Sequence, residues 1–430
     1  MQILTGLLRL RFILPVIAGV AFFYVATTHS LEMKYNLGAP STASSSSATT
    51  APPGIASVVA TSAVSSASSS APEITVTHLP TPSPVKAAYM TSCIASGKTL
   101  RAPLVKLIDE TELNAIVIDI KDYTGTISFR SDDPRFVQNI KGCFVSDMKE
   151  FIASLHEKHI YVIGRVTVFQ DQTFSKSNPD AAVKRKSDGM SWKDKKGLMF
   201  IDPGATEYWD HMVALGKSAY AIGFDEINFD YIRYPSDGNI ADALFARSGT
   251  STKSEMMKKF YSYLGGHMRE AHIPSSADLF GMTTTNMDDL GIGQVLENAL
   301  RSFDYVAPMV YPSHYPPNFN GWKNPNLVPY DIIHFSMTHA VARANALEQK
   351  ESGWVAPSAS TTASSTPHKF VPTGVYANKL RPWIQDFNYG KIYTEVDVRA
   401  EKKAVYDSGL TSWMVWDPKN RYTNSAYDKE

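Results

Sequence analysis

Residues 222–238 read IGFDEINFDYIRYPSDG, a stretch that begins as an apolar strand and ends in a turn. Side chains alternate between the two faces of a strand, so Glu226, Asn228 and Asp230 share one face. A buried carboxylate is costly unless it is paired or hydrogen-bonded. The polar face therefore indicates either a working site or a structural ion-pair network that includes arginines such as Arg233.

Seven further short runs rich in apolar and β-branched residues resemble strands. They are AAYMTSC (87–93), NAIVIDI (114–120), IYVIGRVTVF (160–169), DLFGMTT (278–284), YVAPMVY (305–311), RPWIQDF (381–387) and TSWMVW (411–416). Helical stretches such as 145–159 and 207–222 lie between them, and this alternation predicts a parallel sheet covered by helices. Eight strands in such an α/β pattern predict a (β/α)8 TIM barrel. No glycine-rich phosphate motif follows the first strand, which disfavours a nucleotide-binding doubly wound sheet.

The N-terminal region predicts a membrane anchor. Residues 12–31 contain no Asp, Glu, Lys or Arg, and about 20 apolar residues suffice to cross a bilayer. Arginines within residues 1–11 predict a cytoplasmic N-terminus and place the rest of the chain outside the cytoplasm. We expect an uncleaved signal anchor in a single-pass protein of the cell membrane, with a cleaved signal peptide as the alternative.

The remainder divides by composition. Residues 32–84 are rich in Ser, Thr, Ala and Pro, which predicts a disordered linker. Residues 85–430 are expected to form the barrel, and a similar Ser- and Thr-rich tract at 356–367 is expected to be a disordered insertion within it. The linker would hold the barrel away from the membrane.

The charge balance and the numbers of cysteines and histidines limit which partners, disulfides and metal sites the chain can have. The chain has 42 basic and 42 acidic side chains, a balance that predicts no nucleic-acid partner. Cys93 and Cys143 are too few for a disulfide scaffold, and outside the cytoplasm they either pair or remain free thiols. His156 and His159 belong to a helix with solvent-type neighbours, so we expect no metal ion and no cofactor. The protein is expected to be a monomer.

The side chains at the strand ends carry the chemistry in barrels of this kind. Asp230 lies nearest the end of its strand and is the first candidate catalytic carboxylate. Arg165, on the preceding strand, is expected to lie inside the barrel and to stabilise the charge of Asp230. Glu226 and Asn228 share the same face and are candidate substrate ligands.

A catalytic carboxylate often works with a second carboxyl group that is kept protonated. Candidates are Asp122, Asp289 and Asp417, which follow three other strands. Asp122 ranks first, although pairing with Lys121 is its competing role. The flanking carboxylates also make Lys121 a poor Schiff-base nucleophile, because they keep it protonated.

Aromatic and polar residues near other strand ends suit a carbohydrate ligand. Trp416 is expected to form a stacking floor for a sugar ring, with core packing as the alternative. Tyr311, His314 and Gln385 complete the set of candidate substrate-binding residues.

Several motifs in order resemble one family. They are IDIKDYTG, GFDEINFDYIRYPSDG, FGMTT, IGQVLE, PMVYPSHY, RPWIQDF and WMVWDPKNRY. Over essentially the whole of residues 85–427 the chain resembles the bacterial putative glycoside hydrolase domain family. The resemblance implies a TIM barrel, often displayed on cell surfaces, that acts on carbohydrate.

A more distant similarity connects the chain to chitinase-type barrels, whose fourth strand carries DxxDxDxE. Asp225, Asn228 and Asp230 occupy the three aspartate positions, but Ile232 occupies the position of the glutamate, which is the general acid in those enzymes. The similarity therefore supports the fold more than the reaction. The sequence predicts a glycoside hydrolase that acts on cell-surface or extracellular polysaccharide or oligosaccharide through paired carboxylates. The alternative is an inactive carbohydrate-binding or scaffolding barrel at the cell envelope.

Overall fold

The computed structural model describes residues 74–355 and 369–429. The predicted signal anchor, most of the predicted linker and the predicted insertion at 356–367 lie outside these residues. Within them, no helix has both the length and the apolar character that a membrane span requires.

Eight parallel strands close into a barrel, in the order β1-β10-β9-β8-β7-β5-β3-β2. Their bounds are β1 Lys86–Met90, β2 Ala115–Lys121, β3 Tyr161–Thr167, β5 Glu226–Asp230, β7 Ser275–Phe280, β8 Tyr305–Met309, β9 Trp383–Gln385 and β10 Trp413–Trp416. Each strand overlaps one of the eight runs identified from sequence, although β7 begins three residues before its run, at Ser275. The predicted eight-stranded barrel is therefore confirmed.

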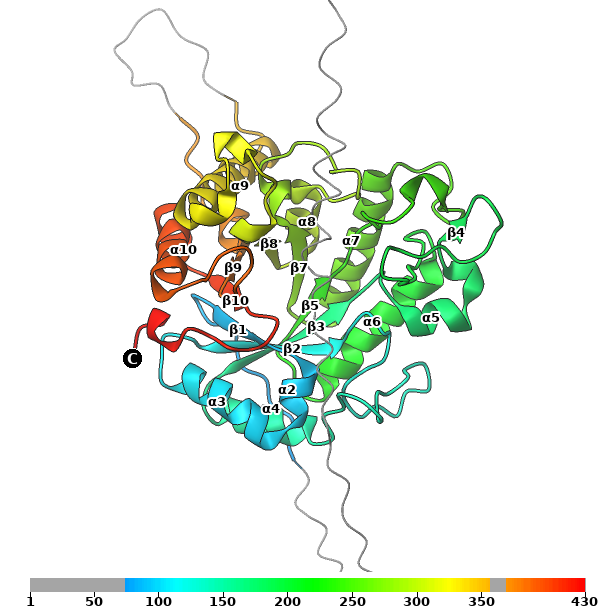
Figure 1. Ribbon diagram of the computed structural model, residues 1–430, viewed down its shortest axis with the longest axis horizontal. Coiled ribbons are helices and arrows are strands. Elements are labelled where there is room, and N and C mark those ends of the chain that lie inside the picture. The colour runs from blue at the N-terminus through cyan, green and yellow to red at the C-terminus, as the bar shows by residue number, and fades with distance from the viewer. Residues whose placement is uncertain (1–73, 356–368, 430) are drawn as a thin grey trace, which may run out of the picture.

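Helices surround the strands on the outside (Figure 1). They are α2 Ser92–Ser96, α3 Lys98–Asp109, α4 Met148–His156, α5 Gln172–Ser177, α6 Thr206–Ala221, α7 Lys253–Glu270, α8 Leu296–Ser302, α9 Pro329–Glu351 and α10 Glu395–Asp407. α4 and α6 correspond to the two helical stretches expected at 145–159 and 207–222. Alternation of strand and helix along the chain thus produces the (β/α)8 arrangement.

The two faces of the barrel strands have different surroundings. On β5, Ile227 and Phe229 pack into the large apolar core between strands and helices. The side chains of Glu226, Asn228 and Asp230 instead bond to groups on other strands inside the barrel. The predicted alternation on β5 is confirmed, because the twofold period of a strand sends every second side chain inward.

Residues 74–84 correct the predicted extent of the linker. This segment is placed in the structure and is bonded to the N-terminal end of the barrel. The backbone N–H of Leu79 donates to Asp225 Oδ1 at 2.7 Å, and Thr81 Oγ1 lies 2.9 Å from the hydroxyl of Tyr161. The side chain of His78 stacks on Tyr220 with 3.8 Å between ring centroids. Composition alone missed this segment because its hydrogen bonds to the barrel and the packing of Leu79 against the core are tertiary contacts.

The loops after β3 and β5 build a lobe beside the mouth of the barrel. It contains α5 and the two short strands β4 Lys184–Arg185 and β6 Ala243–Leu244, which pair antiparallel. Val183, Trp192 and Phe200 form a small separate core within it. In Figure 1 the lobe lies at the right of the barrel, at the labels α5 and β4. The lobe forms one wall of the cavity described below.

Cys93 and Cys143 form a disulfide, with 4.4 Å between their Cα atoms. Cys93 belongs to α2, directly after β1, and Cys143 belongs to the loop after β2. The sequence left open whether the two cysteines pair or remain free thiols, and in the structure they are paired. The bond closes a loop across 50 residues of sequence.

Candidate active site

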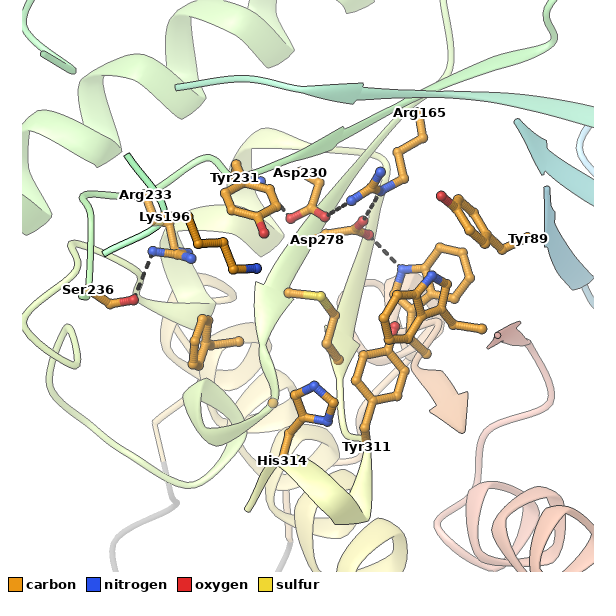
Figure 2. A pocket seen from close by; sticks show the side chains of 15 residues that line it. Tyr89, Arg165, Lys196, Asp230, Tyr231, Arg233, Ser236, Asp278, Tyr311 and His314 are labelled. Carbon is orange, nitrogen blue, oxygen red and sulfur yellow. Dashed lines mark hydrogen bonds and ion pairs between the residues drawn. The ribbon is translucent and has the colours of Figure 1, made fainter. Parts of the chain in front are cut away.

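A cavity of about 180 Å³ opens at the C-terminal ends of the barrel strands. Its lining combines charged groups, aromatic rings and four residues from the loops that build the lobe (Figure 2). The lining residues are Tyr89, Arg165, Lys196, Asp230, Tyr231, Arg233, Ser236, Asp278, Phe280, Gly281, Met309, Tyr311, His314, Trp383 and Trp416. Barrels of this class carry their working groups at this end.

Arg165 on β3 joins three carboxyl groups. Its guanidinium donates to Asp119 Oδ1 at 2.6 Å and also to Asp230 Oδ2, while Nε lies 3.7 Å from Asp278 Oδ2. The register explains the contact with Asp230, because β3 and β5 are neighbours and Thr167 pairs with Asp230. The predicted proximity of Arg165 and Asp230 is present in the structure. The ion pair places a guanidinium against the carboxyl group that ends β5, and Asp230 itself is buried.

Asp230 ends β5 in a constrained conformation. The next residue, Tyr231, has φ of 53°, which is uncommon for a residue with a side chain. Its backbone N–H donates to Asp230 Oδ1 at 2.5 Å. Strained backbone of this kind concentrates at functional sites. Both carboxylate oxygens of Asp230 are thereby fixed in direction.

Asp278 on β7 has a different environment from Asp230. Its Oδ1 accepts hydrogen bonds from Asn228 Nδ2 at 2.9 Å and Trp383 Nε1 at 2.8 Å. Burial, together with the neighbouring charge of Asp230, raises the pKa of Asp278 to about 8. Both donors bind Oδ1, and Oδ2 lies on the side of Arg165, 3.7 Å from its Nε. Asp278 is therefore largely a neutral carboxylic acid at neutral pH.

One guanidinium contacts both Asp230 and Asp278. The two carboxyl groups consequently lie well within the separation of about 10 Å that two-carboxylate glycoside cleavage allows. Two-carboxylate glycoside cleavage needs two carboxyl groups whose environments give them different pKa values, so that one is protonated while the other is ionised.

Aromatic side chains form the wall opposite the lobe. Tyr311 and Trp416 lie with their ring centroids 5.2 Å apart and their planes 32° from parallel, and Phe387 packs edge-on against Trp416 at 5.0 Å. His314 lies on the same side, and burial lowers its pKa to about 4, so it is neutral at pH 7. Trp416, Tyr311 and His314, which were predicted from sequence to bind substrate, all line the cavity. Apolar faces next to polar groups suit a sugar ring.

The three predicted partners of Asp230 do not line the cavity. Asp122 accepts from the N–H and the hydroxyl of Thr124, and Asp289 accepts from the N–H of Gly291, so both stabilise turns. Asp417 is buried beside the cavity wall and accepts from the N–H of Lys419. Burial raises the pKa of Asp417 to about 6. Asp278 occupies the place that these three were expected to fill.

The predicted pairing of Asp122 with Lys121 is also wrong. Lys121 Nζ lies 3.0 Å from Asp171 Oδ2 and donates to the carbonyl of Thr167 at 2.5 Å. Both partners of this ion pair are buried. Lys121 therefore has a structural role behind the cavity wall.

Three other predicted substrate ligands lie away from the cavity surface. Glu226 is fully buried and pairs with Arg381 at 3.1 Å deeper in the barrel. Asn228 acts through Asp278, to which it donates. Gln385 is also fully buried, and its Oε1 accepts from the backbone N–H of Ser313 at 3.2 Å and from its hydroxyl at 2.7 Å. None of these three residues lines the cavity.

The chain belongs to a family of putative glycosyl hydrolase domains. Its residues 87–422 match the model of the family described as "Putative glycosyl hydrolase domain". No curated protein matches the chain in sequence.

Solved structures share the fold. The glycoside hydrolase domain of PgaB (BpsB) from Bordetella bronchiseptica is 12% identical with a TM-score of 0.51, and the match covers 78% of this chain and 94% of that one. Alpha-L-fucosidase isoenzyme 2 from Paenibacillus thiaminolyticus is 11% identical with a TM-score of 0.51, covering 80% of this chain and 47% of that one. A hypothetical protein from Ruminiclostridium thermocellum is 30% identical over 48% of this chain and 98% of its own, with a TM-score of 0.39. At these identities the first two show a common barrel architecture.

Proposed function

We propose that the protein hydrolyses a glycosidic bond in a cell-surface or extracellular polysaccharide or oligosaccharide. The observation that carries the proposal is the pair Asp230 and Asp278, two carboxyl groups that share Arg165 but have opposite environments. Membership of a glycosyl hydrolase family supports the same reaction class.

The roles follow from the two environments. Asp278 donates its proton to the leaving-group oxygen as the glycosidic bond breaks, because its raised pKa keeps it protonated at neutral pH. Asp230, with its charge balanced by Arg165, acts on the opposite side of the scissile bond as the nucleophile or as the base that activates water. Tyr311 and Trp416 hold the sugar ring by stacking against its apolar face.

The predicted signal anchor and linker supply the location in this proposal. The barrel would be held outside the cytoplasm at the cell membrane, where polysaccharides of the envelope are within reach. A protease-protection assay on intact cells tests this, and a barrel that resists added protease until the membrane is broken would contradict it.

The test of function separates cleavage from binding. The purified full-length chain and its Asp230→Asn variant are assayed on a panel of envelope and extracellular polysaccharides for release of reducing ends, and on the same panel for binding. We expect the wild type to cleave at least one glycan that the variant binds with similar affinity but does not cleave. Equal binding with no cleavage by either protein would instead identify a carbohydrate-binding barrel.

A further inference from the structure

The lobe side of the cavity carries two cations. Arg233 and Lys196 line it together with Ser236, and Figure 2 shows these three side chains on the side opposite Tyr311 and His314. The Arg233 residue is only 8% exposed. The roles proposed above for the carboxyl pair and the aromatic wall use neither cation.

The guanidinium of Arg233 is held in place by one of its three nitrogens. Nη1 donates to the carbonyl of Tyr234 at 3.0 Å and to the hydroxyl of Ser236 at 3.2 Å. The flat group also lies near the rings of Tyr231 and Phe280, at 5.0 and 5.2 Å from their centroids. These contacts fix both the position and the plane of the group.

The other edge of the guanidinium has no protein partner. In residues 74–355 and 369–429, Nε and Nη2 of Arg233 make no hydrogen bond, and no carboxylate lies within ion-pair distance of it. These two N–H groups point in parallel, which is the geometry that binds both oxygens of a carboxylate. A largely buried cation without an ion-pair partner is costly, and an anion bound at this edge would reduce that cost.

The charge around the cavity also favours an anion. On the lobe side the described lining residues include two cations, Lys196 and Arg233, and no carboxyl group. Asp237 interacts with Arg233 beyond ion-pair distance, and with a pKa of about 6, raised by burial, it is mostly ionised at pH 7. Asp237 is not part of the cavity lining, so the surface that a ligand meets on the lobe side is cationic.

We propose that the substrate is an acidic glycan, and that the free edge of Arg233 binds the carboxylate of a uronic-acid residue next to the scissile bond. The inference rests on the proposed function for its sugar-cleaving context. The carboxylate approaches side-on to Nε and Nη2 of Arg233, with the Lys196 side chain beside it. A neutral glycan offers only hydroxyl groups, which do not offset the charge of Arg233.

Binding to acidic glycans and their matched neutral forms tests this. Oligomers of galacturonate, glucuronate and mannuronate are titrated into the full-length Asp230→Asn protein, alongside the same oligomers with their carboxyl groups reduced to alcohols. Tryptophan fluorescence reports binding, since Trp383 and Trp416 line the cavity. We expect at least one acidic oligomer to bind about 10- to 100-fold more tightly than its reduced form.

Substituting the arginine isolates its contribution. Asp230→Asn/Arg233→Met is expected to lose the preference for the acidic oligomer, whereas Asp230→Asn/Arg135→Met, which removes an exposed arginine outside the cavity lining, keeps it. Melting temperatures show whether each variant is folded, and Asp230→Asn/Arg233→Lys, which retains the charge, serves as the second variant. A preference that survives in Arg233→Met, or no preference for any acidic oligomer, overturns the proposal.

The outcomes also separate this inference from the proposed function. Arg233-dependent binding of an acidic oligomer that the wild type does not cleave would support the anion site and contradict the hydrolase. Cleavage of neutral glycans with equal efficiency by wild type and Arg233→Met would support the hydrolase and contradict the anion site. Arg233-dependent binding of a phosphate-bearing polymer such as teichoic acid, in place of the uronates, would overturn the carboxylate assignment.

Discussion

Replacing Asp278 with asparagine removes an acidic proton from the cavity while it keeps the shape of the side chain. The amide oxygen of the new residue accepts the hydrogen bonds that Asn228 and Trp383 donate to Oδ1 in the native protein. The variant is therefore expected to fold, and its effect on turnover reports the loss of proton donation.

The size of the effect follows from the pKa. Burial raises the pKa of Asp278 from 3.8 to about 8. At pH 7 roughly 90% of this carboxyl group is protonated, against less than about 0.1% at the ordinary value. Proton donation by a well-placed acid contributes about 10²- to 10⁴-fold to rate, so Asp278→Asn should lower kcat on a natural glycan by that factor.

The assay compares two leaving groups on the sugar that the wild type cleaves. A dinitrophenyl glycoside leaves as a stable phenolate and needs no proton, so Asp278→Asn should cleave it within about tenfold of the wild-type rate. The natural glycan should show the full loss. An equal loss on both substrates, or full activity on the natural glycan, would refute the assignment of Asp278 as the acid.

Three further predictions concern pH, charge and the disulfide. Since the protonated form of Asp278 is the active one, kcat/KM of the wild type should hold below its pKa of about 8 and fall above it, whereas a profile flat to pH 10 would contradict this. Arg165→Met leaves the buried carboxyl groups of Asp119 and Asp230 without their cation, so at pH 7 it should lower the free energy of unfolding by about 3–5 kcal/mol. The cost should shrink at pH 4, where the carboxyl groups take up protons, and equal denaturant midpoint shifts at both pH values would argue against it. Thiol titration of the denatured, unreduced chain should find no free Cys93 or Cys143, and Cys93→Ser should lower stability by about 2–4 kcal/mol, whereas two titratable thiols would exclude the bond.

The barrel could be predicted because each strand carries its own local signal. Short β-branched runs separated by amphipathic helices fix the strand count, and alternation on β5 assigns Asp230 to the interior. The proximity of Arg165 to Asp230 followed from the same reasoning, because consecutive strands of such a barrel are neighbours. These features depend on the spacing of apolar residues along the chain and on the order of the strands, and both can be read from the sequence.

The partner of Asp230 was missed for a physical reason. Asp122 and Asp289 follow strands, but in loops the direction of a side chain is set by turn hydrogen bonds that no periodicity reveals. The sequence did contain a pattern that indicates Asp278. Ser276, Asp278 and Phe280 share one parity on β7, and alternation would have turned Asp278 inward as it did Asp230. The raised pKa of Asp278 depends on packing and could not be predicted from sequence.

The most direct test of the Asp230–Asp278 pair compares three aspartate variants on one glycan that the wild type hydrolyses. Release of reducing ends at pH 7 is measured for Asp230→Asn, Asp278→Asn and Asp289→Asn in the full-length chain. We predict losses of at least about 100-fold for the first two and near wild-type activity for Asp289→Asn, which changes a carboxyl group in a loop turn outside the cavity lining. Wild-type activity in either of the first two variants would contradict the two-carboxylate mechanism.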